Sequence, residues 1–466
     1  MKIPLISLLE QQQKSMSLAM LWALSVLLEP LLYFVLADQT QIGFAGNISR
    51  LLQFFVMALI AAHFLSGRCL RISTYARNLC FPLSLFILYA FVVSLFGFFF
   101  GTYSGGQTWG DQAGLSSVFQ SNKTRPVVEL FILIFQFFYF VILPMVLLRT
   151  KRDLDFLFRC AFFFLSVHFI AGWIDFILTP LGVDLISRHL ADGRSVGLRF
   201  HGLAGEPRDA AVYMMSLFFF VATYYFYRNG SVPLLKKTHV AIIAVSCLAT
   251  VSASFLVAVC ASLLLWLTYG LRRISADFIV RSLILVIVFF LIVGFSISYF
   301  ERLDRYLTIY QDNLVKLYQD PHQDLPRLVK NSFNNIYPII HVLKEFDDGK
   351  IFPLFFGHGA GGSGVANSII YGEYNNPNNQ FARLIFDYGV VGTLLFIFLF
   401  IQSIKRSVIG MPSLDRDRLV SYGLIMLGGV FAHRTNVWLI WLGILMAVSN
   451  YRCRATNLCS SPKKRN

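Results

Sequence analysis

The chain contains a succession of apolar segments that are long enough to cross a lipid bilayer. A membrane-spanning helix needs about 17 to 25 apolar residues, because it rises 1.5 Å per residue through a hydrocarbon core of about 30 Å. The chain is 56% hydrophobic and only 14% charged, against about 25% charged residues in soluble domains. We therefore predict an all-α, polytopic membrane protein that forms one integral membrane domain over residues 1–466. The predicted spans are 16–37, 51–66, 81–101, 127–148, 156–178, 210–227, 279–299, 381–404, 419–432 and 436–451.

One apolar stretch, 238–270, is too long for a single crossing. A straight helix over it would be about 50 Å long, against a hydrocarbon core of about 30 Å. We expect two short crossings that turn at residues 252–254. The total is then about twelve transmembrane helices, and both termini lie on the same side of the membrane.

The basic residues support this topology. With twelve spans, more than half of the 40 Lys and Arg residues fall on the face that carries the two termini, and the positive-inside rule makes that face cytoplasmic. Two larger loops, 179–209 and 300–380, belong on the opposite face. The second follows helix nine, and its apolar periodicity predicts two amphipathic helices, the later one starting at Asp324 and burying Leu343. The net charge of +15 thus reflects membrane topology and contact with lipids, and we expect no nucleic-acid partner.

The loop 179–209 is rich in arginine. Guanidinium groups grip phosphate oxygens with two parallel hydrogen bonds, so an outward-facing cluster suits a lipid-linked pyrophosphate or another anion. The alternative is that these side chains pair with lipid headgroups and with nearby carboxylates. The cluster comprises Arg188, Arg194, Arg199 and Arg208, and the nearby carboxylates are Asp192, Glu206 and Asp209.

A glycine-rich segment lies in the loop 300–380. Gly357, Gly359 and Gly362 match the pattern G-x-G-x-x-G, but no strand–helix–strand unit is predicted around them, which argues against a dinucleotide site. The glycines are either a nest of backbone N–H donors for an anion or simple turns. His201, His358 and His433 fall on the same face, yet none has the spacing of a metal-ligand motif, and we expect no metal.

Three local patterns are informative. The first is RFHGLAGEPRDAAVYM, which begins at Arg199. The second is PRLVKNSFNNIYPII, which contains Arg327, followed by FPLFFGHGAGG. The third is NNQFARLIFDYGVVG, at the junction between the polar loop and the following span. In this order they resemble patterns of the bacterial O-antigen polymerases and O-antigen ligases, with Arg327 matching the loop arginine of the family. Ligases usually have a histidine where this chain has Asn378, and this difference favours the polymerase branch.

The resemblance implies a multi-pass enzyme of the bacterial inner membrane. Such an enzyme transfers a growing sugar chain from undecaprenyl pyrophosphate to an acceptor hydroxyl at the periplasmic face, without a metal or cofactor, and a chain-length regulator and a flippase are possible partners. Pyrophosphate is a good leaving group, so the protein must mainly orient its substrates and stabilise departing charge. The pyrophosphate-binding residues would be Arg199 and Arg327, supported by Arg194 and Arg208.

Further site residues follow from the same resemblance. Asn378, Asn379 and Arg383 would orient sugar hydroxyls or phosphate oxygens, and His201 and His358 would also contact the substrate. The general base is open between Glu206, which we prefer, and His201, His358 or Glu373. Two rival functions remain: a ligase that transfers finished polymer to lipid A-core, and a lipid-linked oligosaccharide flippase or other transporter, which the scarcity of charge deep in the spans disfavours.

Overall fold

The computed structural model is built of helices, and its described residues contain no strand. The all-α prediction is therefore confirmed. The structure describes residues 17–28, 48–65, 72–99, 125–183, 199–203, 207–250, 252–270, 297–319, 329–330, 333–371, 376–433 and 435–455.

Five of the described helices are long and apolar enough to cross a membrane. They are α5 (Thr74–Phe99), a composite of α7 (Arg125–Phe137), the π-helix η2 (Phe138–Ile142) and α8 (Leu143–Leu147), α9 (Lys151–Leu178) with the short η3 (Thr179–Leu181), α10 (Pro207–Asn229), and α19 (Gln380–Ser407). They support a multi-pass membrane protein, while the total of about twelve spans stays a prediction. Most of the predicted span 279–299 lies outside the described residues.

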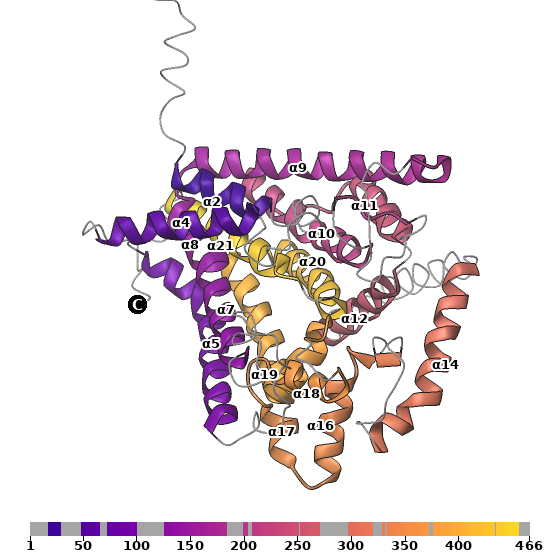
Figure 1. The fold of residues 1–466 in the computed structure, drawn as a ribbon. Helices are drawn as coiled ribbons and strands as arrows, with labels where there is room; N and C mark the ends of the chain where they lie inside the picture. The colour runs from indigo at the N-terminus through magenta and orange to yellow at the C-terminus, as the bar shows by residue number, and fades with distance from the viewer. Residues whose placement is uncertain are drawn as a thin grey trace, which may run out of the picture.

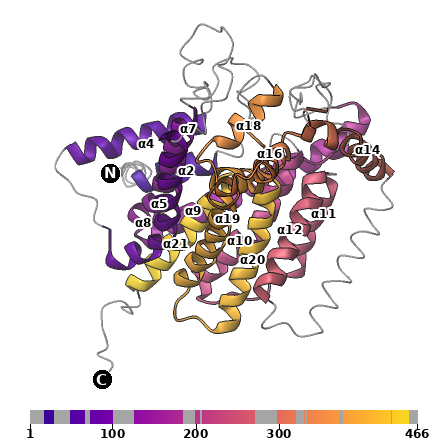
Figure 2. The same cartoon turned by 90° about the horizontal axis from the view of Figure 1, so that it is seen from below.

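The remaining helices are shorter or more polar, and they fall into two groups. The first group joins the bundle: α2 (Leu18–Leu27), α4 (Ile48–Leu65), α11 (Lys237–Ala249), α12 (Ala253–Gly270), α20 (Ser413–Ala432) and α21 (Val437–Ala455). The second comes from the loop 300–380: α14 (Ile297–Gln319), α16 (Tyr337–Asp347), α17 (Ile351–Phe356) and α18 (Gly362–Tyr371). Figure 1 shows α9 along one edge of the bundle, with α14, α16 and α17 on the other side of α20 and α12. In Figure 2, α16 and α18 lie at one end of the bundle.

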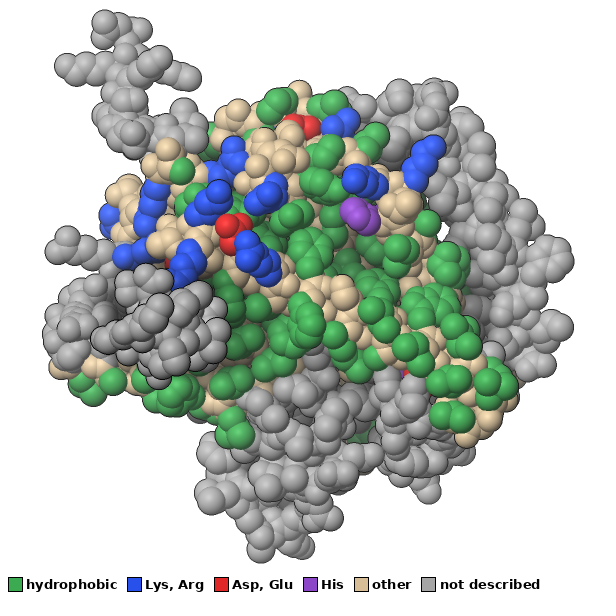
Figure 3. Space-filling model, turned by 90° about the horizontal axis from the view of Figure 1, so that it is seen from above, with side chains coloured by type: hydrophobic (Ala, Val, Ile, Leu, Met, Phe, Trp, Pro, Cys, Tyr) green, Lys and Arg blue, Asp and Glu red, His purple; other side chains and the backbone are tan. Residues whose placement is uncertain are grey.

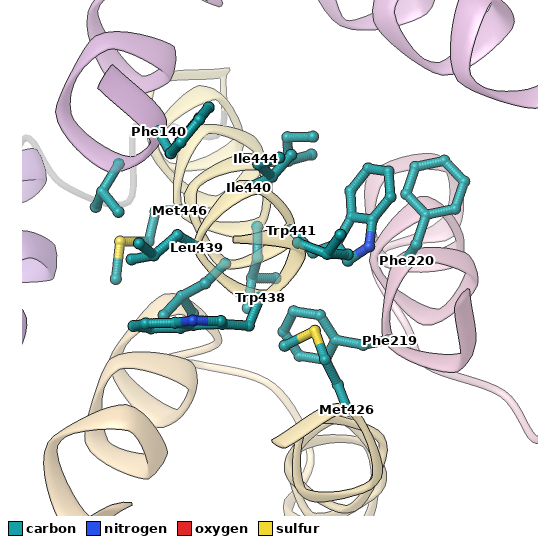
Figure 4. Close-up of a cluster of buried hydrophobic side chains, with 14 of the residues drawn as sticks. Phe140, Phe219, Phe220, Met426, Trp438, Leu439, Ile440, Trp441, Ile444 and Met446 are labelled. Atoms are coloured by element: carbon teal, nitrogen blue, oxygen red, sulfur yellow. The ribbon is translucent and has the colours of Figure 1, made fainter. Parts of the chain in front are cut away.

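Helix α21 forms the centre of the bundle. Trp438 and Trp441, one turn apart on this helix, point towards different neighbours, and side chains from α10, α20 and η2 surround it (Figure 4). The Trp441 ring lies 4.5 Å from that of Phe220, and its Nε1 donates to Ser216 Oγ at 2.9 Å. Because the indole N–H has a partner, the large ring can be buried without the cost of an unpaired donor.

The π-helix η2 is accompanied by a proline in the following turn, and it packs against a glycine of α21. Pro144 has no N–H to donate to the carbonyl of Phe140, so the regular helical ladder is interrupted here. That carbonyl oxygen instead faces Gly443 of α21, where a β-carbon would lie 1.8 Å from it. Any side chain at 443 would therefore push α21 away from η2.

The surface of the bundle matches a lipid environment. Large apolar side chains on the long helices are widely exposed, including Leu88 at 58%, Phe131 at 67% and Phe163 at 64%. Figure 3 shows such side chains over much of one face, with Lys and Arg gathered towards one edge. We call this edge the basic end, where α9, α11 and α20 begin and α10, α19 and α21 end. Its described basic residues include Arg77, Arg149, Lys151, Arg152, Arg228, Lys236, Lys237, Lys405, Arg406, Arg416, Arg418, Arg452 and Arg454.

Helices α11 and α12 form a hairpin, as the length of 238–270 predicts. The Val232 carbonyl just before α11 accepts from Arg418 at 3.2 Å, and Tyr269 near the end of α12 donates to Asp417 at 3.3 Å. Both ends of the hairpin thus lie beside the first turns of α20, at the basic end. At 1.5 Å per residue, α11 is only about 20 Å long and α12 about 27 Å, so the tip lies within the bundle.

The second amphipathic helix of the loop 300–380 differs from the prediction. Asp324 lies outside the described residues, and a turn over 334–336 interrupts the expected continuous helix. Pro338 then occupies the first turn of α16, where its missing N–H costs nothing. Leu343 is 47% exposed instead of buried, because α16 is rotated relative to a helix continuing from 329. Val329, Phe333, Tyr337 and Ile340 do share one apolar cluster, with Leu317 of α14.

Candidate functional site

Buried charges collect at the end of the bundle opposite the basic end. There Arg383 Nη2 of α19 donates to Glu129 Oε2 of α7 at 3.1 Å, and the two side chains are 9% and 3% exposed. Asn376 donates to the other carboxylate oxygen of Glu129 at 2.9 Å. Glu129 thus binds two polar groups from the segment that leads into α19. This network fixes the α19 entry against α7 in a largely apolar setting.

The glycine-rich segment does form a nest of N–H donors, and a side chain of this chain occupies it. Asp387 Oδ1 accepts from the Ser363 N–H at 2.7 Å, and Oδ2 accepts from the Gly361 N–H at 3.1 Å. These donors belong to the start of α18, where an anion is favoured. The predicted nest of N–H donors is therefore present, and the anion that it binds is the Asp387 side chain of the same protein.

The same segment crosses α19 at a kink. Gly389 has φ 68° and ψ −177° inside the helix, and a β-carbon there would lie 2.3 Å from the Phe355 carbonyl carbon and oxygen. Gly357 makes the reciprocal approach, since a β-carbon there would lie 2.5 Å from backbone atoms of Asp387. Tyr89 of α5 donates to the Tyr388 carbonyl at 2.9 Å, which satisfies one group released by the kink.

Residues 199–203 reach the tip of the α11–α12 hairpin. The Phe200 N–H donates to the Ala249 carbonyl at 2.8 Å, and Arg199 Nε donates to the Thr250 carbonyl at 3.0 Å. Both acceptors belong to the C-terminal end of α11, which would otherwise leave carbonyls unpaired. Arg199 therefore stabilises the hairpin through its Nε donor, and the phosphate binding implied by the family resemblance stays a prediction.

Two histidines beside this loop are enclosed. His201 Nε2 lies 3.3 Å from Asp175 Oδ2 of α9, with side-chain exposures of 1% and 0%. His168 Nδ1 accepts from the Leu203 N–H at 3.1 Å. Gly202 packs directly on the His168 ring, where a β-carbon would lie 2.4 Å from it. His201 is thus an internal partner of Asp175 and is not open to a substrate.

A more accessible pair joins α10 to the end of α20. His433 Nε2 contacts Asp209 Oδ1, and the two side chains are 9% and 38% exposed. Asp209 lies in the first turn of α10, next to Arg208, which is partly exposed. A carboxylate that holds one imidazole nitrogen fixes the tautomer and leaves the other nitrogen as a base. The pair thus has the composition of a general acid–base group.

A third histidine–carboxylate group involves α16 and the glycine-rich segment. His358 Nε2 lies 2.7 Å from Glu345 Oε2, and His341 Nε2 lies 4.0 Å from Oε1. The His358 ring stacks on Phe386 of α19 at 4.1 Å. Lys350 Nζ lies 3.9 Å from Glu345 Oε1. His358 therefore connects α16 to α19.

Burial and charge shift two pKa values in this group in the same direction. Burial lowers the pKa of His341 below its ordinary 6.5, although the Glu345 charge opposes the shift. Burial alone would raise the pKa of Glu345, but contact with His358 and the charges of His341 and Lys350 outweigh it and lower the pKa below 4.5. Both groups bind protons more weakly in the folded state than in the unfolded state.

We expect the folded protein to lose stability as the pH falls. With lowered folded-state pKa values, His341 contributes stability that is complete above about 6.5 and declines below it, and Glu345 adds a further decline below about 4.5. The variant His341→Gln should lose less Tm than the wild type between about pH 7.5 and pH 5.5. Thermal unfolding in detergent measures this, with His239→Gln at the basic end as control. An unchanged pH slope in His341→Gln would contradict the assignment.

The remaining predicted site residues are a helix cap, a partly exposed residue, and four residues outside the described ranges. Asn379 is the N-cap of α19, because its Oδ1 accepts from the N–H groups of Phe381 and Ala382 at 2.7 and 3.1 Å. Asn378 is partly exposed at the same entry. Arg194, Glu206, Arg327 and Glu373 lie outside the described residues, so their placement stays a prediction.

Several polar residues of this end were not among the predicted site residues. The sequence indicates Asp209 only as a partner for arginine and His433 only in connection with a metal, and no motif points to Glu129 or Glu345. Glu129 had a usable signal, since it is a carboxylate within an apolar segment, where ionisable groups normally have a partner. Among the described residues, no group of three or more His, Cys, Asp and Glu is arranged to hold a metal ion.

Comparison with protein-family models finds no match to this chain, and a search of curated proteins also finds none. The resemblance to O-antigen polymerases and ligases therefore depends on the three sequence patterns alone.

Proposed function

We propose that this protein polymerises lipid-linked oligosaccharide repeat units at the membrane surface opposite its basic end. The substrates would be undecaprenyl-pyrophosphate-linked glycans, and the product would be O-antigen or a related surface polysaccharide. The observation that carries the proposal is the first turn of α10, where Arg208 adjoins the contact between Asp209 and His433. The cation for the leaving group is thus the residue before the carboxylate that contacts the base.

The proposed transfer of the sugar chain uses His433, Asp209 and Arg208. The acceptor hydroxyl would lose its proton to Nδ1 of His433, whose Nε2 faces Asp209, and its oxygen would attack the anomeric carbon of the donor sugar. The bond from that carbon to the pyrophosphate oxygen breaks, and the leaving group carries the electron pair away. Arg208 and the positive end of α10 would stabilise the new charge. In this assignment His433 replaces Glu206 as the preferred general base.

The remaining predicted residues would serve the same surface. Arg327 and Arg194 keep their proposed role on the pyrophosphate, and Asn378 is exposed enough to contact a sugar hydroxyl. Arg383 and Arg199 instead have internal partners, Glu129 and Thr250. We therefore assign these two arginines to the support of the site.

The variant His433→Gln should shorten the glycan product strongly. Removal of a general base typically lowers the rate by about 10² to 10⁴, so the deletion strain carrying this variant should make mainly single-repeat product on a surface-glycan gel. Arg208→Gln should also fail, whereas His239→Gln at the basic end should restore the full ladder. If His433→Gln restores the full ladder at normal protein level, the assignment of the base is wrong.

The same deletion strain separates polymerase from ligase. Single-repeat product indicates a lost polymerase, whereas bare core indicates a lost ligase or an earlier step. The hypothesis of a flippase or transporter predicts that purified protein fails to elongate a lipid-linked repeat unit. Elongation without any ion gradient would support the polymerase.

A further inference from the structure

A cavity of about 390 Å³ opens between α9 and α10 near the basic end, towards the opposite ends of these two helices from Asp175 and Asp209. It combines aromatic walls with charged residues at its rim. The lining residues are Asp155, Phe158, Arg159, Phe162, Tyr224 and Arg228.

The aromatic walls of the cavity are well ordered by mutual contacts. Phe162 meets Tyr224 edge-on with ring centroids 4.8 Å apart, and Phe158 stacks on Tyr227 at 5.1 Å. Phe158 also contacts the Tyr224 ring at 5.3 Å. These large rings hold the two helices apart and leave an apolar groove between them.

The rim carries more positive than negative charge. Asp155 Oδ1 accepts from the Tyr227 hydroxyl at 2.8 Å and lies 3.9 Å from Arg228 Nη1. Arg228 is 53% exposed, so its remaining donors face outwards. Arg159 is exposed and forms no ion pair within the described part of the chain. Two guanidinium groups therefore flank a groove that contains one, already occupied, carboxylate.

The depth of the cavity matches the headgroup level of a bilayer. The apolar run Lys151–Leu181 has 31 residues, which is about 46 Å of helix against a hydrocarbon core of about 30 Å. Its ends must extend beyond the hydrocarbon. Arg159 lies about 12 Å above the start of α9, near the boundary between headgroups and acyl chains, and Phe162 continues into the apolar layer.

We infer that this cavity binds an anionic phospholipid from the leaflet on the basic side. The phosphate lies between Arg159 and Arg228, which act as charge-assisted donors. The upper part of an acyl chain lies against Phe158, Phe162 and Tyr224. A lipid fits better than a soluble anion, because the aromatic walls would remain exposed beneath a bare phosphate and the leaflet on the basic side carries anionic headgroups.

Native mass spectrometry of the purified protein in detergent tests this inference. Phosphatidylglycerol should form a retained one-to-one adduct. Phosphatidylcholine should bind at least about tenfold more weakly, because its choline places a positive charge beside the two guanidinium groups. Arg159→Gln should weaken phosphatidylglycerol binding by about tenfold, and the double variant Arg159→Gln/Arg228→Gln should abolish the adduct. Arg159 is exposed and unpaired within the described residues, so its single variant keeps the fold.

The matched control is the double variant Arg152→Gln/Lys237→Gln, which removes the same charge at the basic end from two exposed residues outside the cavity. This control should bind phosphatidylglycerol like the wild type. Equal loss in the control would show a general charge effect and overturn the site. Displacement of the lipid by millimolar inorganic phosphate would show a free-anion site and would also overturn the inference, as would full retention in the cavity double variant.

Discussion

Replacing Gly389 by alanine should leave almost no folded protein. Gly389 has a φ of 68°, and a β-carbon added to it would lie 2.3 Å from the Phe355 backbone. The left-handed backbone alone costs about 1–3 kcal/mol for a residue with a side chain. The overlap with a second backbone segment adds to this. Neither α17 nor α19 can move freely, because a β-carbon at Gly357 would also lie only 2.5 Å from the Asp387 backbone. We expect a total loss above about 4 kcal/mol.

The yield of monodisperse protein in size-exclusion chromatography measures this effect. Gly349→Ala is the matched control, since its φ is 82° but nothing lies within 4 Å of a β-carbon there. That control should cost only the strain of the backbone and leave most of the protein folded. If both variants give similar yields, the crossing of the glycine-rich segment with α19 is not the close contact described here.

Arg383→Met should be the second most damaging change. It would leave the Glu129 carboxylate, 3% exposed, without its guanidinium partner, and breaking a buried ion pair from one side costs about 3–5 kcal/mol. Adding Glu129→Gln removes the unpaired charge, so the double variant should regain much of the loss. Thermal unfolding in detergent gives the Tm of each protein.

An exposed ion pair supplies the comparison for this experiment. Lys350 is 62% exposed and lies 3.9 Å from Glu345, and such pairs contribute about 0–1 kcal/mol. Lys350→Met should therefore change the Tm little. The buried-pair assignment fails if Arg383→Met is no worse than Lys350→Met, or if the double variant is no more stable than Arg383→Met alone.

The parts of the fold that depend on local sequence could be predicted. Apolar length identified the long helices, and the excess length of 238–270 predicted the break between Ala249 and Ala253. The N-cap role of Asn379 also has a local signal, because asparagine before an apolar helix commonly caps it. These features depend on a few neighbouring residues and on the thickness of the bilayer.

The partners within the candidate site could not be predicted in this way. Glu129 and Arg383 are 254 positions apart, and no local pattern relates them. Arg199 and the Thr250 carbonyl that accepts from its Nε are 51 positions apart, so this contact too has no local signal. The nest of N–H groups was visible in the glycines, but its occupant, Asp387, depends on how α19 packs against α18.

The α11–α12 hairpin has a consequence for biosynthesis. Neither arm reaches the length of about 20 residues that a helix needs to enter the membrane alone, so we expect the two arms to insert together as one unit. The groups that satisfy its tip, Phe200 and Arg199, are synthesised before the hairpin. The donors that pair with the carbonyls at the tip are therefore already synthesised when the hairpin leaves the ribosome. Cysteines introduced at 237 and 270 should label from the same side of the membrane. Labelling from opposite sides would show that the arms do not enter as a pair.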